Sequence, residues 1–293
     1  MALTPLIATS IAPNERIELQ KRAISSWLNI GMEVISLNTL EEIEELQPIF
    51  KNIKFIPQMR TGQTLFGRPY IFISDILNYF RQNNYDICGI INSDISLVAD
   101  PGLSAFLCEQ ARNSLVFGPR FQVKSFSDKD GTIDPLGFDY FIFDRHLVSD
   151  WHESYFCLGL PSWDHWFPLV SILTGRPVKK IISQIAFHAY HDVRENREVL
   201  SLNNEFVRQI IKYFSLTEQN LSRLTNTENV TLFNEFQFAN NYNTIVKKID
   251  NTITTGDGIE SKCYEELAIF FDEFTRYSIH FLEKKSEKLE FKS

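Results

Sequence analysis

Short apolar runs alternate with segments of helical character through the first half of the chain. Each run is bounded by polar or turn residues, which is typical of buried strands. The predicted strands of this kind lie at 6–8, 34–37, 54–56 and 88–91. Helices are predicted between them, at 14–30, 39–50 and 70–80. Strands that alternate with helices indicate an α/β fold with a mostly parallel sheet and right-handed crossovers.

The alternation continues less regularly after the fourth run. Asp100 and Pro101 suit the N-cap and first position of a helix over 101–113. A further helix over 166–174 is ended by Gly175, and Asp130-Gly131 suits the tip of a hairpin within a polar excursion. Further strands are predicted at 115–118, 138–143 and 178–182.

The composition and the hydrophobic pattern of the chain change near residue 200. Residues 215–243 are polar and rich in Asn and Thr, and amphipathic helices are predicted on either side, at 206–214 and 264–281. We therefore expect two domains, an α/β domain over 1–199 and a helical appendage over 200–293. The apolar stripe of the appendage is expected to pack on the first domain or on a partner subunit, so a homo-oligomer through these helices is one expectation.

Composition indicates a globular protein and argues against nucleic-acid and membrane-spanning classes. Apolar residues make up 44% and charged residues 23%, which is ordinary for a globular chain. A net charge of −8 argues against a nucleic-acid partner, which needs a basic face. No run is apolar and long enough for a transmembrane segment, and the first residues lack the basic start of a secretory signal. The four cysteines are scattered, as expected for reduced thiols, so a cytoplasmic location is predicted.

The strand at 88–91 ends in Asn92-Ser93-Asp94, which organises the functional interpretation. On a strand, residues two apart face the same side, so Asn92 and Asp94 would point together from its carboxyl end. That edge of a parallel sheet is where ligands bind. One interpretation makes the triplet an ordinary polar turn. The other makes Asp94 a ligand of a divalent cation that holds a nucleotide diphosphate.

The order of several pieces supports the second interpretation. An α/β start and the triplet are followed by the strand 137–141, a Gly-x-Pro-x-Trp-Asp loop at 159–164 and a late pair of histidines. Over residues 1–195 this order resembles the nucleotide-diphospho-sugar transferases, the GT-A type of glycosyltransferase. The resemblance implies a GT-A-like Rossmann-type sheet. It also implies transfer of a sugar, of hexosyltransferase type, from a nucleotide-sugar donor to a carbohydrate or other hydroxyl acceptor.

The Asp-x-Asp motif of that family falls on the triplet, with Asn92 in place of the first acid. The resemblance implies that Asp94 binds Mn²⁺ or Mg²⁺ and that Asn92 contacts the ribose, without bringing charge to the cation. His188 or His191 would complete the metal shell, and an imidazole among oxygen ligands favours Mn²⁺. If helical, these two residues share a face. Alternatively, both are surface or core residues paired with Tyr190 or Asp192.

Asp164 is the candidate base that takes the proton of the acceptor hydroxyl in an inverting enzyme. In a retaining enzyme it would orient the acceptor instead. The alternative is an N-cap, because a helix follows it directly. Trp163 and Trp166 are expected to stack on an acceptor sugar. Asp139 is expected to be structural or to face the acceptor, outside the catalytic set.

Nucleotide contacts are predicted in two places. Thr9 and Asn38 follow the first two strands, where such sheets bind ligands. Arg60 and Arg68 lie in the long loop 57–69 and could reach the diphosphate, although Arg68 alternatively covers a helix end.

Two other functions stay open. A sugar nucleotidyltransferase is weakened because ATSIAPNER, at residues 8–16, is a poor substitute for a glycine-rich, basic phosphate loop. A catalytically silent binding or scaffold protein of the same fold is credible because Asn92 replaces an expected acid.

Overall fold

The chain forms two compact units. The computed structural model describes residues 4–128, 130–190 and 278–292, together with positions 202, 203, 205, 206, 208–210, 213, 275 and 276. The first unit comprises 1–196 and 285–293, and the second comprises 197–284. The predicted division near residue 200 therefore does not account for the last nine residues, which belong with the first unit.

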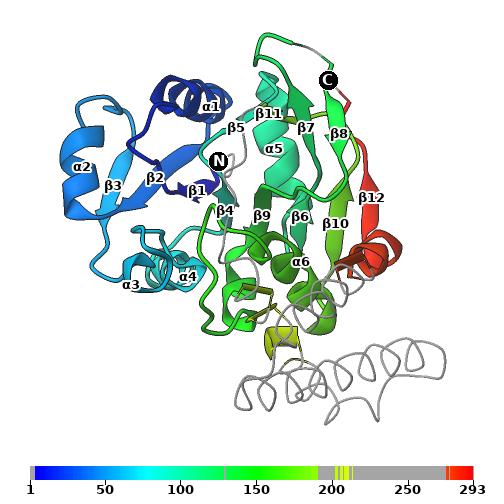
Figure 1. The fold of residues 1–293 in the computed structure, drawn as a ribbon. Coiled ribbons are helices and arrows are strands. Elements are labelled where there is room, and N and C mark those ends of the chain that lie inside the picture. The colour runs from blue at the N-terminus through cyan, green and yellow to red at the C-terminus, as the bar shows by residue number, and fades with distance from the viewer. Residues whose placement is uncertain are drawn as a thin grey trace, which may run out of the picture. The chain divides into compact units, whose positions relative to one another are not determined.

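A sheet of eight strands forms the centre of the first unit (Figure 1). The strand order is β12-β10-β6-β9-β4-β1-β2-β3. The strands are β1 (Leu6–Thr9), β2 (Glu33–Asn38), β3 (Lys54–Pro57), β4 (Ile87–Ile91), β6 (Leu115–Phe117), β9 (Tyr140–Asp144), β10 (Val178–Ile181) and β12 (Glu287–Leu289). β9 is antiparallel to both of its neighbours and the other pairs are parallel, so the predicted mostly parallel sheet is confirmed.

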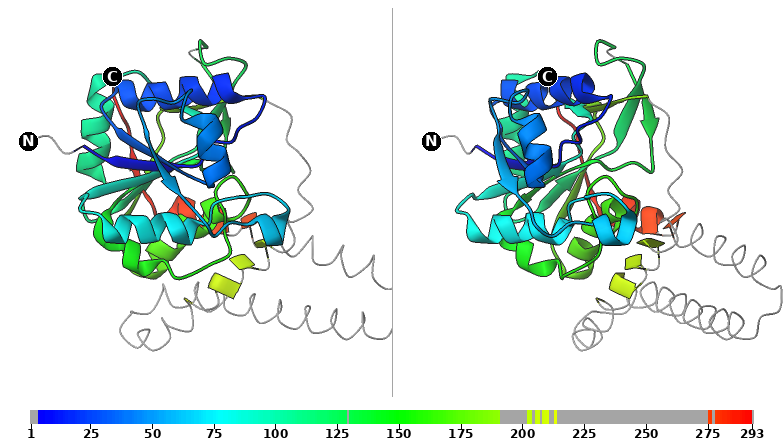
Figure 2. Two further views of the ribbon diagram at one scale, coloured as in Figure 1. Left: turned by 90° about the vertical axis from the view of Figure 1, so that its left-hand side faces the viewer. Right: turned by 60° about the vertical axis from the view of Figure 1, so that its left-hand side comes forward.

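Helices cover both faces of this sheet (Figure 2). The helices of the first unit are α1 (Ile17–Asn29), α2 (Leu40–Leu46), α3 (Gln63–Phe66), α4 (Ile73–Gln82), α5 (Pro101–Gln110) and α6 (Trp163–Leu173), with a short 3₁₀ helix at Arg145–Asp150. Alternate residues of β9 pack against helices on opposite faces of the sheet. Tyr140 and Ile142 lie in the core cluster that includes α1 and α5, whereas Phe141 and Phe143 contact aromatic rings of α6 and α4.

A smaller sheet stands beside the carboxyl end of β4. It has four strands in the order β5-β11-β7-β8. They are β5 (Ile95–Leu97), β7 (Arg120–Val123), β8 (Thr132–Asp134) and β11 (Ala186–Ala189). β5 is antiparallel to β11, β11 is parallel to β7, and β7 forms a hairpin with β8. The predicted hairpin is present, but its turn lies at 125–128, where the N–H of Asp128 donates to the carbonyl of Ser125 at 2.9 Å. Asp130-Gly131 leads directly into β8, so the prediction of the tip at these two residues is wrong.

Several elements depart from the predictions. The sequence indicated neither β5 nor β12, which have three residues each, and the short helix α3 lies inside the predicted loop 57–69. The segment around His188 is a strand, so the helical alternative for the histidine pair is wrong. Of the two helices predicted in the appendage, every position that the structure describes is helical.

In the parts of the chain that are described, no helix has the length and apolar character needed to cross a membrane.

Three of the cysteines agree with the predicted reduced thiols. Cys88, Cys108 and Cys157 are buried thiols, and Cys263 lies outside the described residues. Cys88 is the second residue of β4, which lies between β1 and β9.

Candidate functional site

The triplet 92–94 forms a tight turn that leads from β4 into β5. The backbone N–H of Asn92 donates to the carbonyl of Asp139 at 3.0 Å, which extends the pairing of β4 with β9 by one residue. The N–H of Ile95 then donates to the carbonyl of Asn92 at 3.1 Å, which closes the turn. Asp94 therefore stands between the two sheets, at the carboxyl edge of the larger one.

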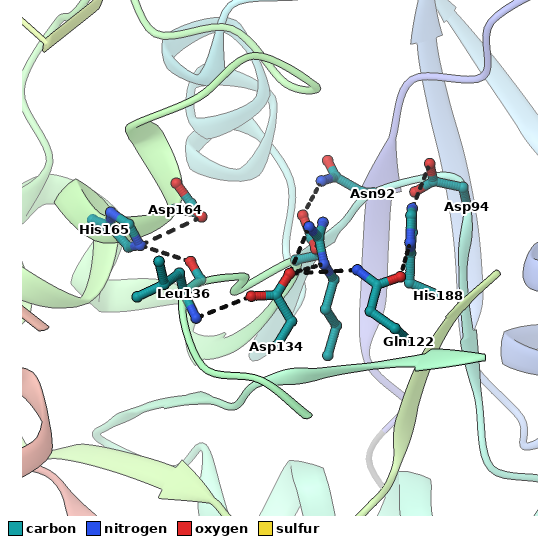
Figure 3. A network of polar contacts seen from close by, with 10 residues as sticks. Asn92, Asp94, Gln122, Asp134, Leu136, Asp164, His165 and His188 are labelled. Carbon is teal, nitrogen blue, oxygen red and sulfur yellow. Dashed lines mark hydrogen bonds and ion pairs between the residues drawn. The ribbon is translucent and has the colours of Figure 1, made fainter. Parts of the chain in front are cut away.

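His188 reaches Asp94 from a distant part of the chain (Figure 3). β11 runs antiparallel to β5 and pairs His188 with Ile95, the residue next to Asp94. The imidazole Nε2 lies 3.4 Å from Asp94 Oδ2. His188 is almost buried, with 8% of its side chain exposed, and Asp94 is 25% exposed. The sequence prediction that these two side chains meet is therefore in agreement with the geometry.

The spacing of these two atoms suits one divalent cation. Adjacent ligands of an octahedral ion, each at ~2.0–2.1 Å from the metal, lie about 3 Å apart. A carboxylate oxygen and an imidazole nitrogen are also donors that Mn²⁺ accepts. Among the residues that the structure describes, no three His, Cys, Asp or Glu side chains form a metal cluster. The described residues would thus supply two ligands here, and phosphate oxygens and water could fill further positions, as they commonly do at magnesium sites.

Asp139 joins the turn to a buried ion pair. Because β9 is antiparallel to β4, the residue before β9 lies at the edge where β4 ends. The Asn92 amide Nδ2 donates to Asp139 Oδ1 in a short hydrogen bond. Arg120 Nη1 donates to Asp139 Oδ2 at 2.6 Å. Gly137 makes room for this guanidinium, since a Cβ there would lie 2.6 Å from Arg120 Nε.

The shift in the pKa of Asp139 shows that the carboxyl groups of Asp94, Asp139 and Asp164 lie near one another. Burial raises the pKa of the Asp139 carboxyl, and the positive charge of Arg120 opposes that shift. The negative charges of Asp164 and Asp94 raise the same pKa further. Asp139 therefore interacts with both predicted acids, although they come from different elements, and it belongs to the site more closely than the sequence indicated.

Asp164 lies in the first turn of α6. The helix begins at Trp163, with Ser162 at the N-cap in a left-handed conformation (φ 77°), so the alternative that Asp164 is the N-cap is wrong. The next residue, His165, has its Nε2 2.8 Å from the carbonyl of Leu136 and 3.8 Å from Asp164 Oδ2. Asp164 keeps 16% of its side chain exposed, which allows contact with a substrate.

The tryptophans beside Asp164 have a different role from the predicted one. Trp163 and Trp166 are 1% and 0% exposed. Trp163 packs on Phe141 of β9, and Trp166 packs on Phe156. The prediction that they stack on an acceptor sugar is therefore wrong. They fix α6 against the sheet, and thereby hold Asp164 at its edge.

The two residues predicted to contact the nucleotide after β1 and β2 are completely buried. Asn38 donates through Nδ2 to the carbonyl of Ile11 at 2.8 Å and accepts from Ser36 at 2.6 Å. It thus shapes the loop 10–16 instead of presenting a free amide. Thr9 is 0% exposed, and its hydroxyl has no hydrogen-bond partner among the described residues.

Gln20 links this loop to the turn after β4. Its amide Oε1 accepts from the backbone N–H of Ala12 at 2.9 Å and from the Ser93 hydroxyl at 2.8 Å. The side chain amide also donates to the Ala12 carbonyl at 2.8 Å. Sequence analysis placed this residue only on a helix. The loop 10–16 is therefore held next to the triplet by a buried glutamine.

The arginines of the loop 57–69 differ from each other. Arg60 lies 2.6 Å from Glu153 and 3.5 Å from Asp75, and its guanidinium is 4.5 Å from the centre of the Phe72 ring. These contacts tie the loop to α4. Arg68 is exposed. Their predicted contact with a diphosphate stays a prediction, and His191 lies outside the described residues.

Comparisons with known proteins give only distant likenesses. No family model matches the chain, and no curated protein matches it. Among solved structures it is similar to residues 1–349 of S. aureus TarS in complex with UDP-GlcNAc, with 10% identity, a TM-score of 0.49, and 97% of this chain and 92% of that chain covered. It is also similar to a 4-diphosphocytidyl-2C-methyl-D-erythritol synthase from Anaerococcus prevotii, with 12% identity, a TM-score of 0.41, and coverage of 70% and 97%. At these scores the likenesses carry no argument, and the site is interpreted from its own geometry.

Proposed function

We propose that this protein is a glycosyltransferase that moves a sugar from a nucleotide-diphosphate donor to a hydroxyl acceptor, with a divalent cation, Mn²⁺ or Mg²⁺, at the donor site. The observation that carries the proposal is the approach of His188 Nε2 to Asp94 Oδ2 at the carboxyl edge of the sheet. Edges of this kind are where open α/β sheets bind ligands.

The cation would be held by Asp94 and His188. When bound, it would stabilise the negative charge that grows on the diphosphate as the glycosidic bond breaks. Asn92 is held by Asp139 and brings an amide to the site without a charge, which suits a neutral partner such as a ribose hydroxyl. Arg120 keeps the charge of Asp139 balanced, so that the buried carboxyl does not repel a diphosphate.

Asp164 would act on the acceptor. In an inverting reaction its carboxylate takes the proton of the acceptor hydroxyl while that oxygen attacks the anomeric carbon. The bond between the anomeric carbon and the diphosphate oxygen breaks, and its electron pair leaves with the nucleoside diphosphate. The electrostatic effect of Asp164 and Asp94 on the same buried carboxyl supports a single site for the base and the donor.

Calorimetry with a panel of nucleoside diphosphates, with and without Mn²⁺, tests the proposal. We expect one of them to bind only when Mn²⁺ is present, and this binding to be lost in Asp94→Ala. The matched control is Asp130→Ala, which removes an exposed carboxylate from the loop between β7 and β8. Absence of binding for every nucleotide would contradict the proposal.

Turnover assays beside the calorimetry separate the two alternatives. Binding of a nucleoside diphosphate without turnover of any sugar nucleotide would favour a catalytically silent scaffold. That alternative has one observation in its favour, because Asn92 replaces an acid and the described residues hold only two ligands for a cation. Release of pyrophosphate from a nucleoside triphosphate and a sugar phosphate would identify a nucleotidyltransferase.

A further inference from the structure

Gln122 connects His188 to a charged pair beneath the site (Figure 3). On β7, Arg120 and Gln122 are two residues apart, so both side chains leave the same face of the strand. His188 Nδ1 lies 2.9 Å from Gln122 Oε1. On its other side, the Gln122 amide Nε2 donates to Asp134 Oδ2 at 3.4 Å. The glutamine thus stands between an imidazole and a carboxylate.

Asp134 fixes the direction in which the Gln122 amide points. Burial alone would raise the pKa of Asp134, but the charge of Arg120 and hydrogen bonds to its carboxylate lower it. Arg120 donates to Asp134 Oδ2 through Nε at 3.0 Å and Nη2 at 2.9 Å. The carboxylate is ionised and can only accept hydrogen bonds. The amide must therefore turn its NH₂ group to Asp134 and its oxygen to His188.

The direction of the amide in turn fixes the proton on the imidazole. Gln122 Oε1 has no hydrogen to give, so His188 Nδ1 must carry one in order to form the 2.9 Å contact. In histidine, the hydrogen bond made by one ring nitrogen decides the state of the other. Nε2, which faces Asp94, is then the nitrogen that can lose its proton and offer a lone pair.

We propose that Gln122 is a positioning residue that keeps the proton of neutral His188 on Nδ1 and so reserves Nε2 for a cation shared with Asp94, with Asp134 and Arg120 holding the glutamine in place. The cation rests on the function proposed above, whereas the tautomer does not depend on it. A residue of this kind is commonly worth 10- to 100-fold in metal affinity.

The tautomer is measured by nitrogen-15 NMR of the histidine rings in the metal-free, full-length protein, at a pH at which His188 is neutral. We expect the proton on Nδ1 in the wild type. Gln122→Met removes the acceptor at similar volume, and we expect the proton to move to Nε2, where Asp94 accepts it. Gln122→Glu keeps an acceptor oxygen, and we expect it to retain the Nδ1 proton. A wild-type spectrum with the proton on Nε2 would overturn the inference.

Binding of Mn²⁺ alone, followed by electron paramagnetic resonance, gives the second measurement. We expect about 10-fold weaker binding in Gln122→Met than in the wild type. Gln184→Met is the matched control, because Gln184 is exposed and its amide oxygen accepts from Gly131 on the neighbouring loop, not from a histidine. Equal affinity in Gln122→Met and wild type would also count against the inference. A wild type that binds no Mn²⁺ contradicts the cation of the proposed function, while the tautomer still decides the role of Gln122.

Discussion

At the scale of single residues, the site depends on a few polar side chains that are each held from two sides. Asp164 illustrates this, since α6 presents it and the aromatic packing of Trp163 and Phe141 fixes the helix. His165 connects the same turn to the carbonyl of Leu136. A carboxylate that is held in this way needs little reorganisation to meet an acceptor hydroxyl, which favours its use as a base.

Replacing Asp164 by Asn tests that role directly. The amide has nearly the same shape but cannot accept the proton, so we expect the rate of sugar transfer to fall by about 10²–10⁴-fold. Affinity for the nucleoside diphosphate should stay unchanged, because Asp164 acts on the acceptor. The measurement is steady-state transfer with the donor whose nucleotide binds most tightly, and Asp130→Asn is the control. An unaltered transfer rate in Asp164→Asn would remove Asp164 from the mechanism.

The sequence predicted the principal pair of the site but missed its supports. Asp94 follows a recognisable apolar run, and His188 stands in a short list of late histidines, so both could be found. Arg120 and Gln122 alternate with Phe121 in a period of two, which was the available signal for a strand face. Their partners on β8 and β11 depend on tertiary pairing, which no local pattern gives.

At the scale of elements, β4 positions the site because it is fully buried between β1 and β9. Its pairing with these two strands fixes the position of the turn at residues 92–94. Gly89, in the middle of β4, lets these strands pack closely. A Cβ there would lie 2.6 Å from Cδ1 of both Ile7 and Ile142, and 3.0 Å from the backbone oxygen of Phe141.

Gly89→Ala should therefore destabilise the first unit. Overpacking of a well-packed core costs about 1–3 kcal/mol, and the backbone oxygen cannot move aside as a flexible side chain can. Urea unfolding followed by tryptophan fluorescence measures the change. The control is Gly102→Ala in the first turn of α5, where the nearest atom to a new Cβ is the Asp100 side chain at 3.1 Å. Equal midpoints for Gly89→Ala and wild type would show that the strands can shift without cost.

Elements with a mainly apolar sequence were predictable even when short, and short elements of mixed sequence were not. Each apolar run of the first unit that was predicted as a strand is a strand. For β4 and β6 the reason is burial on both faces, which requires a continuous apolar sequence. α2 is shorter than predicted, as it ends at Leu46 and only its start carries a capping box, made by Thr39 and Glu42. β5 and β12 have three residues each and include polar ones, so they show neither a continuous apolar run nor a periodic signal.

At the scale of the whole molecule, the end of the chain returns to the sheet on which it began. β12 pairs in parallel with β10, the N–H of Ile182 donates to the carbonyl of Leu289 at 2.9 Å, and the ring of Phe291 lies 5.2 Å from that of Phe106. The sequence between β11 and β12 is therefore an insertion between two strands of one unit. A division into successive domains could not be read correctly from composition, because the return involves only a short, polar strand.

Buried groups of the first unit also give the molecule a characteristic dependence on pH. Burial lowers the pKa of Lys180 from 10.5 to about 8. Above pH 8 this amine is less protonated in the folded state than in the unfolded state, so its own contribution makes the free energy of unfolding rise with pH. Burial raises the pKa of Cys88 and Cys157 from 9.0 to about 12, and that of Cys108 to about 11. Above pH 9 the unfolded state loses these thiol protons first, so the free energy of unfolding falls.

We therefore expect stability to pass through a maximum at about pH 8–9, because at pH 9 the three thiols, half-ionised in the unfolded chain, already outweigh the single amine. Each group fully engaged contributes about 1.4 kcal/mol per pH unit, so the thiols of Cys88, Cys108 and Cys157 outweigh the single amine of Lys180 above that pH. The measurement is urea unfolding between pH 7.5 and 10.5 with a reductant present, followed by the fluorescence of the four tryptophans, all of which lie in the first unit. In Lys180→Met the rise below the maximum should disappear while the fall above pH 9 remains. A free energy of unfolding that still increases from pH 9 to 10 in the wild type would contradict the raised pKa of these buried thiols, because their ionisation in the unfolded chain should lower it.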